Sequence, residues 1–278
     1  MAVTQFIPKV WSARIIEKLR STLVYGQSQV VNTDFQGEIN EFGDTVHVHG
    51  HSDVTVSAYA RNTTTLAYQL LNDERRSIVI DQSDYFAVSH DDLDAAQVKP
   101  KLLDSVSQDA AYRLAAVQDA YIANLGVAGR GSVLEGAAGA ARQITVANAY
   151  TTFVEASVKL DEANVPESGR FAVVPPWMAG VLLQDDKYFL QAKGDAILNG
   201  QIGTIAGISI LKSNRVPLAT TVYSVLIGHN MAISFASQID KVEGLRAVNS
   251  FADLLRGLTL YGGKVLYPEA LINLRASK

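Results

Sequence analysis

The chain has 278 residues, of which 24 are basic and 28 acidic, and its formal net charge is −4. Apolar residues make up 48% of it and cysteine is absent. This composition excludes intrinsic disorder, disulfides, thiolate nucleophiles and cysteine-ligated zinc. The weakly acidic balance provides no basic surface for reading DNA, and no apolar run approaches the ~20 residues of a membrane span. We therefore expect neither sequence-specific nucleic-acid binding nor a membrane partner.

Charge is distributed unevenly along the chain. Residues 1–20 sum to +3, residues 73–94 to −5 and residues 241–278 to +3. Solvated faces of one subunit would explain these segments. Alternatively, the basic segment of one copy meets the acidic segment of the next. The candidate contact residues for that second hypothesis are Trp11, Arg14, Lys18, Asp81, Asp84 and Asp91.

The first third of the sequence predicts a short helix followed by strands. Pro8 suits a first helical position, and Trp11, Ile15 and Leu19 form one apolar stripe after it. Residues 45–49 and 53–57 alternate with period two, which predicts a hairpin that turns at residues 50–52. Residues 78–80 form a third short strand. Few large apolar side chains lie between the strands, so we expect an extension that projects from a body.

The clearest helix is predicted to begin at Pro100 and to end at Gly126. Its apolar positions recur at intervals of three and four residues, and they are Leu103, Val106, Ala110, Leu114, Val117, Tyr121 and Leu125. Such a helix would be about 38 Å long. That length suits a spine against which a sheet packs.

The second half of the sequence predicts a compact α+β unit over residues 130–238. It begins with a flexible connection over residues 126–140. Thr152 and Glu155 match a capping box, which predicts a helix that starts there and ends near Asn164. Strands are expected over residues 171–174, 208–211 and 222–227, and then over 257–261 and 264–267, which return to the long helix.

One cluster suggests metal chemistry. His47, His49 and His51 share one face of a predicted strand, and imidazole is a common zinc ligand. A metal-dependent hydrolase built on them is one hypothesis. However, same-face neighbours on a strand lie about 6.5–7 Å apart, so a polar face of an exposed hairpin explains the pattern as well.

Other catalytic signatures are missing from the sequence. It contains no phosphate-binding loop of the P-loop type and no G-x-S-x-G nucleophile elbow. The aspartates near residues 81–94 could supply paired carboxylates, but their density favours a solvated edge. We therefore predict no enzyme, no catalytic residue and no cofactor.

The order of these elements and several local motifs resemble the major capsid proteins of tailed bacteriophages, which have the Hong Kong 97-type fold. The motifs are residues 6–12 (FIPKVWS), 34–38 (DFQGE), 43–46 (GDTV), 164–176 (NVPESGRFAVVPP), 207–217 (GISILKSNRVP) and 261–270 (YGGKVLYPEA). The resemblance covers nearly the whole chain. It implies an α+β fold with an N-terminal arm (1–33), an extended loop (34–80), a peripheral domain (81–128 and 239–278) and an axial domain (129–238).

The resemblance implies a structural function. The chain would assemble with itself through hexamers and pentamers into an icosahedral head enclosing double-stranded DNA. Portal and scaffolding proteins, and a decoration protein, would be its partners. It would reside in the virion, and in the host cytoplasm during assembly. A nanocompartment shell of the same fold, enclosing cargo enzymes instead of DNA, is the alternative.

Overall fold

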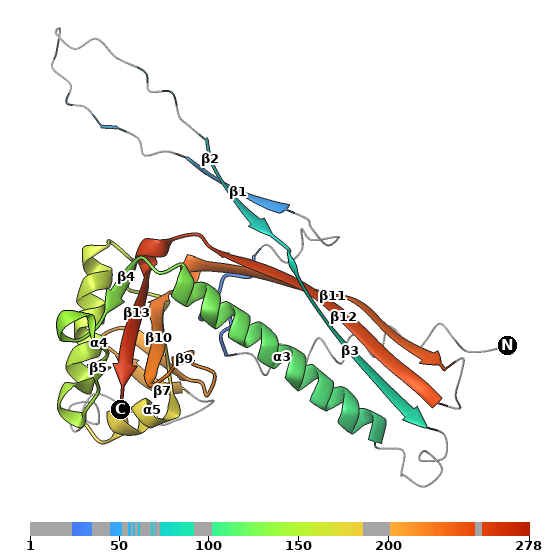
Figure 1. The fold of residues 1–278 in the computed structure, drawn as a ribbon. Helices are drawn as coiled ribbons and strands as arrows, with labels where there is room; N and C mark the ends of the chain where they lie inside the picture. Colours follow the sequence, from blue (N-terminus) through green and yellow to red (C-terminus); the bar gives the residue numbers. More distant parts are fainter. Residues whose placement is uncertain are drawn as a thin grey trace.

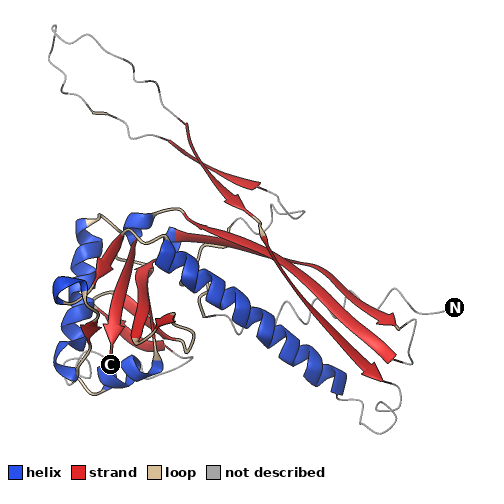
Figure 2. Ribbon diagram, viewed as in Figure 1, coloured by secondary structure: helices blue, strands red, loops and turns tan. Residues whose placement is uncertain are grey.

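The computed structural model describes residues 24–34, 45–51, 73–91, 102–185, 201–247 and 252–278, together with single positions between 55 and 70. These residues form three β-sheets and three α-helices, the mixed α+β class that the sequence predicts (Figures 1 and 2). A compact unit and an elongated unit lie side by side, and a thin two-stranded ribbon projects from them (Figure 1). None of the described helices is long and apolar enough to cross a bilayer.

The projecting ribbon consists of β1 (Thr45–His51) and β2 (Asp73–Val79), which pair antiparallel from Thr45 opposite Val79 to His51 opposite Asp73. The predicted partner of the first strand, residues 53–57, was wrong, since residues 55 and 56 lie outside any strand. The true partner has the sequence DERRSIV. Apolar alternation does not detect it, because a two-stranded ribbon away from the core does not need a buried face.

The elongated unit is a three-stranded antiparallel sheet against one long helix. Its strand order is β11 (Ile233–Arg246), β12 (Ala252–Val265) and β3 (Gln82–Asp91). Helix α3 (Leu102–Ala128) runs along one face of the sheet (Figure 1). Gln118 donates to the Thr259 hydroxyl at 3.3 Å, and the Tyr121 ring meets the Tyr261 ring edge-on at 5.2 Å. These contacts fix which sheet face the helix covers.

Helix α3 confirms the predicted spine helix, and its 27 residues give a length of about 40 Å. Its predicted end at Gly126 was wrong, because the helix continues to Ala128. Gly126 serves packing instead. A Cβ there would lie 2.6 Å from Cδ2 of Leu226, in the neighbouring strand β10 (Val222–His229). The glycine therefore lets the helix approach that strand closely.

The compact unit contains an eight-stranded mixed sheet. Its main order is β4 (Ser132–Leu134), β13 (Leu271–Ser277), β10 (Val222–His229), β6 (Arg170–Val174), β8 (Ile208–Lys212) and β7 (Gln201–Ile205). Strand β5 (Arg142–Gln143) pairs with β13, and β9 (Leu218–Ala219) pairs with β10. The strands predicted at 171–174, 208–211 and 222–227 are confirmed as β6, β8 and β10. Those at 257–261 and 264–267 belong largely to one long strand, β12.

Two helices pack on this sheet, α4 (Val146–Glu162) and α5 (Pro176–Leu183). The predicted start of α4 at Thr152 was wrong. Asn148 Oδ1 accepts from the Thr145 N–H at 2.8 Å, so the capping box lies seven residues earlier. Thr152 is buried inside the helix, and Glu155 pairs with Arg142 at 2.7 Å.

The connection predicted to be flexible is ordered. Residues 126–140 include the end of α3, strand β4 and the 3-10 helix Ala137–Gly139. Arg275 of β13 binds Glu135 at 2.8 Å and the Gly139 carbonyl at 2.7 Å. A strand from the other end of the chain therefore holds this segment.

Two of the links between the compact and elongated units are short 3-10 helices. Strand β10 passes into β11 through the 3-10 helix Asn230–Ala232, and β12 passes into β13 through the 3-10 helix Pro268–Ala270. The Ala232 carbonyl accepts from the Leu266 N–H at 2.7 Å, which ties one link to the other. The main core fills the compact unit and continues under α3. A separate small core contains Ile78, Ile80, Ala236 and Leu260.

Candidate functional site

The predicted metal residues lie in the projecting ribbon. His47, His49 and His51 occupy alternate positions of β1, and their side chains lie outside the described part of the structure. The register pairs them with Ser77, Arg75 and Asp73 of β2. Among the described side chains, no three of histidine, aspartate or glutamate come together as a metal site.

The predicted contact residues fall in three places. Trp11, Arg14 and Lys18 lie outside the described residues. Asp81 directly precedes β3 and Asp84 is the third residue of that strand, which is an edge strand of its sheet. Asp91 ends the same strand, opposite Ala252, so it is far from the other two; its side chain is not among those described.

Asp81 and Asp84 differ in environment. Asp81 is exposed, which agrees with a solvated edge. Asp84 is half-buried, and its Oδ2 accepts from the Tyr261 hydroxyl at 2.6 Å across 177 residues of sequence. The prediction of a solvated edge therefore holds for Asp81 and is wrong for Asp84, which serves an internal contact.

The hydroxyls near this pair stay protonated. Burial, followed by the hydrogen bond and charge of Asp84, raises the pKa of Tyr261. Burial and the charge of Asp81 raise the pKa of Tyr121. Neutral tyrosines donate hydrogen bonds, so this group braces β3, β12 and α3.

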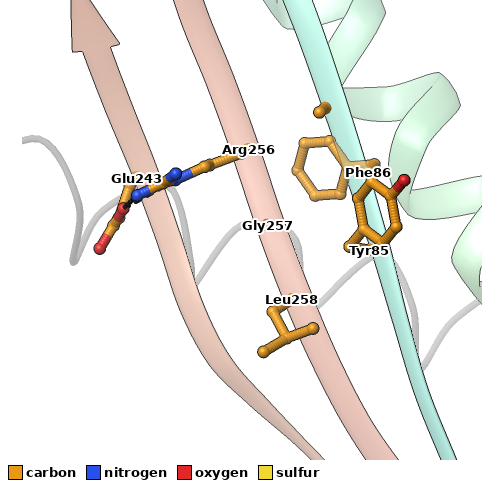
Figure 3. Close-up of a pocket in the computed structure, with 7 residues that line it drawn as sticks. Tyr85, Phe86, Glu243, Arg256, Gly257 and Leu258 are labelled. Atoms are coloured by element: carbon orange, nitrogen blue, oxygen red, sulfur yellow. Dashed lines mark hydrogen bonds and ion pairs between the residues drawn. The ribbon is translucent and has the colours of Figure 1, made fainter.

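The sheet face opposite α3 carries an open depression of about 460 Å³ (Figure 3). Its lining residues are Tyr85, Phe86, Ala87, Glu243, Arg256, Gly257 and Leu258. Tyr85 is 77% exposed. Beside it the Arg256 Nε donates to Glu243 Oε2 at 2.9 Å (Figure 3). A shallow surface that joins an exposed aromatic to a charged pair suits contact with a protein better than enclosure of a small molecule.

The projecting extension also exposes apolar side chains. At its described positions Val56, Tyr68 and Leu70 are 89–93% exposed. Large apolar side chains with this exposure are typical of surfaces that contact a partner.

Residues 24–34 are fixed to the body by an aspartate that the sequence analysis did not select. Asp119 of α3 is 3% exposed, and its Oδ1 accepts from the backbone N–H groups of Val24 at 2.9 Å and Tyr25 at 2.7 Å. Asn32 then bridges β11, where its N–H donates to the Ile233 carbonyl at 2.8 Å. The signal available in the sequence was the position of Asp119 within a helix predicted to be packed against a sheet. An aspartate is rarely buried unless it has a partner, so a buried position there would indicate a hydrogen-bonding role.

Known structures with the same arrangement decide the fold. A structure from Mycobacterium phage Che8 is 28% identical, with 98% of this chain and 93% of that chain covered at a TM-score of 0.73. The capsid structure of cyanophage P-SCSP1u is 19% identical, with 93% and 89% covered at 0.74. The chain has the Hong Kong 97-type fold of tailed-phage major capsid proteins. No protein-family model and no curated protein matches it.

The capsid fold is not restricted to phage heads among the matching structures. A virus-like particle from Pyrococcus furiosus is 10% identical, with 97% of this chain and 99% of that chain covered at a TM-score of 0.60. Phage capsids and this particle therefore share with the chain one fold, which the matching structures place in shells of different origin.

Proposed function

We propose that this chain is the major capsid protein of a tailed phage, the repeating subunit of an icosahedral head that encloses double-stranded DNA. The observation that carries the proposal is the similarity to the Che8 structure, which extends over 98% of this chain at 28% identity. A likeness of that extent leaves little room for an inserted catalytic unit. In this proposal the chain assembles through hexamers and pentamers and has no enzymatic activity.

The exposed surfaces support assembly by unlike contacts. The extension with Tyr68 and Leu70 and the depression beside Tyr85 lie on different parts of the subunit, and both expose apolar surface. When one patch meets a different patch on the next copy, the contact is heterologous and repeats into rings or lattices. We infer that the extension of one subunit covers the sheet of its neighbour.

The expected division of the chain is also proposed. Residues 1–33 form the arm, 34–80 the extended loop, 81–128 with 239–278 the peripheral domain, and 129–238 the axial domain. Strand β13 hydrogen-bonds to β10 and β4, which favours moving residues 271–277 to the axial domain.

The basic arm and the acidic segment form a second proposed contact between copies. Arg14 and Lys18 of one subunit would face either Asp81 or Asp91, which lie near opposite ends of β3, in the next subunit. Reversing both arm charges to glutamate should weaken assembly at low salt more than it weakens folding. Restoring complementarity with Asp81→Lys and Asp91→Lys should recover assembly. Equal losses of assembly and folding, or no recovery, would contradict this contact.

Sedimentation tests the main proposal. The recombinant chain should enter fast fractions of a sucrose gradient, and electron microscopy of these should show closed shells, tubes or sheets of hexamers. Because a phage head requires a scaffold in some cases, the assay is repeated with scaffolding and portal proteins encoded beside the gene. A chain that stays monomeric in both conditions would contradict the proposal.

A nanocompartment shell is the second candidate, favoured by the likeness to the Pyrococcus furiosus particle. Nuclease-protected DNA inside native particles would support the phage head, whereas an enclosed enzyme would support the compartment. In the phage case we also propose portal, scaffolding and decoration partners, and a passage through the host cytoplasm before the virion.

A hydrolase built on His47, His49 and His51 is a third candidate, carried only by residue type. Stoichiometric zinc that is lost in a His49→Ala variant would support it. Zinc absent from the purified wild-type chain would remove it.

A further inference from the structure

The chain crosses over its own sheet at the point where the extension begins. Strand β2 ends at Val79 and β3 begins at Gln82, so only two residues separate the ribbon from the edge of the three-stranded sheet. At this crossing the backbone of Val79 and Ile80 passes over Gly262 of β12. A Cβ on Gly262 would meet the Val79 carbonyl oxygen at 2.2 Å and the Ile80 Cα at 2.8 Å.

That approach is too close for any side chain. Both nearest atoms belong to backbone, so a rotamer change cannot relieve the overlap. Ala236, the residue opposite Gly262 in β11, is also small and fully buried. Two small residues side by side thus form the floor on which the crossing rests.

The crossing is held from both sides. Ile78 and Ile80 are fully buried, and together with Ala236 and Leu260 they form the small core separate from the main one. Beyond it, the Arg76 guanidinium lies 5.3 Å from the centre of the Tyr267 ring, a contact that favours one placement of the cation. The base of the extension is therefore a fixed joint, whose height above the sheet depends on residue 262.

We propose that Gly262 sets the direction in which the extension leaves the subunit, and thereby the position at which it meets the next copy. The geometric part of this proposal, the direction of the extension, depends only on the crossing. Its consequence, the position of the contact with the next copy in a shell, rests on the proposed function. A methyl group at position 262 lifts Val79 and Ile80 off the sheet and tilts the ribbon, while the body keeps its fold.

Distance measurements between spin labels test the geometric part. Because the chain has no cysteine, Tyr68→Cys in the extension and Val158→Cys in α4 provide two unique exposed labelling sites. In Gly262→Ala the mean distance between labels should move by more than the width of the wild-type distribution. The matched control is Gly244→Ala in β11, where a Cβ meets nothing within 4 Å and the distribution should not change.

Two results would overturn the inference. One is an unchanged distance distribution in folded Gly262→Ala. The other is a Gly262→Ala body that no longer folds, since the crossing would then belong to the folding of the body. Tyr267→Leu removes the ring under Arg76 without adding bulk at the crossing, and should broaden the distribution without displacing its mean. An unchanged distribution there would remove the cation–ring contact from the joint.

Assembly is a separate readout of the consequence. Gly262→Ala subunits should give open sheets or shells of altered diameter where wild type and Gly244→Ala give uniform shells. If Gly262→Ala shifts the label distance but its shells remain uniform and keep the wild-type diameter, the direction of the extension does not determine how the shell assembles. If the wild-type chain forms no shell under any condition, the proposed function fails, while the label distances still decide the geometric part.

Discussion

The Oδ1 atom of Asp119 lies 2.7 Å from the backbone nitrogen of Tyr25, across 94 residues of sequence. Together with the bond from Val24, this contact attaches the segment before the extended loop to the middle of the spine helix. Tyr25, Val30 and Val31 are fully buried behind it. The carboxylate therefore acts as a cap for a turn that belongs to a distant part of the chain.

Replacing Asp119 separates its hydrogen bonding from its charge. Asp119→Ala leaves the two N–H groups without an acceptor, and each buried unpaired donor costs about 1–3 kcal/mol. Asp119→Asn keeps an acceptor oxygen and should cost less. Denaturant unfolding of the two variants measures the difference, and equal losses would contradict the capping role.

Asp119 should also make stability depend on pH. Burial raises the pKa of its carboxyl above the usual range, although the backbone N–H groups of Tyr25 and Val24 oppose the shift. The folded chain then binds the proton more tightly than the unfolded chain. This stabilisation is complete below the unfolded pKa and is lost as the pH rises through the folded pKa.

Asp119→Asn does not titrate, so its stability does not fall as the pH rises through the folded pKa of Asp119. The free energy of unfolding of Asp119→Asn minus that of wild type should therefore increase from acid towards neutral pH and then level off. Other carboxyl groups cancel in the difference. A difference that stays flat across this range would contradict the raised pKa.

The Tyr261 hydroxyl should contribute through Asp84. Tyr261→Phe removes the 2.6 Å bond to a half-buried carboxylate, and a hydrogen bond to a charged group contributes about 1.5–3 kcal/mol. Because the folded pKa of Tyr261 is raised, its part of the stability is present below the ordinary value near 10 and is lost at higher pH. Tyr85→Phe, at an exposed ring, should change the free energy of unfolding by less than about 0.5 kcal/mol.

Arg170 should be essential for the loop between α4 and β6. Its side chain is 1% exposed and binds Asp161 at 2.6 Å, Ser157 at 3.1 Å and the Pro166 carbonyl at 2.9 Å. Arg170→Ala leaves the Ser157 hydroxyl and the Pro166 carbonyl without their donor, and each buried unsatisfied group costs about 1–3 kcal/mol. Asp161, by contrast, is 54% exposed, and its lost charge pair adds little. Arg170→Lys should not rescue it, because an ammonium cannot reproduce the planar set of donors.

The control for Arg170 is Arg113→Ala, which breaks an exposed pair with Asp109 one helical turn away. Its cost should be far smaller than that of Arg170→Ala, because both side chains of the pair are exposed to solvent. Chemical denaturation measures both, and a mild Arg170→Ala variant would show that the loop keeps its shape without the guanidinium.

Tyr85 should matter for assembly and not for folding. Its ring is 77% exposed beside the depression on the outer sheet face, so Tyr85→Asp should leave the free energy of unfolding within about 0.5 kcal/mol of wild type. Under the proposed function it should abolish fast-sedimenting particles. Val158→Asp on α4 is the matched exposed control. Normal particles from Tyr85→Asp would exclude this face from the contact.

The spacing of apolar residues predicted the helices and strands that bury one continuous apolar face or run. The spacing from Leu103 to Leu125 gave α3, and short apolar runs gave β6, β8 and β10. The short strand predicted at residues 78–80 found only the end of β2, because the rest of the ribbon does not bury a continuous apolar face. Strand β11 was missed because its sequence ISFASQIDKVEGLR combines apolar and charged stretches. Gly126 was misassigned because a helix-ending glycine and a packing glycine look alike until the neighbouring strand is known.

For the candidate site, the sequence predicted which kinds of side chain are present but not which of them are in contact. The acidic character of residues 73–94 is readable, but the bond between Asp84 and Tyr261 joins positions that no local pattern relates. The same holds for Asp119 and Tyr25. Such pairs depend on topology, since β3 reaches Tyr261 only after the extension has returned to the sheet.

The pairing of β11 with β12 has a mechanical consequence. Both strands are 14 residues long, and they run antiparallel from Ile233 opposite Val265 to Arg246 opposite Asp253. A force that slides the two strands past each other along their length loads many of these hydrogen bonds at once. A force perpendicular to the strands breaks the bonds one after another. The elongated unit should therefore resist stretching along its axis far better than peeling at its tip, which makes it a tension-bearing element of the subunit.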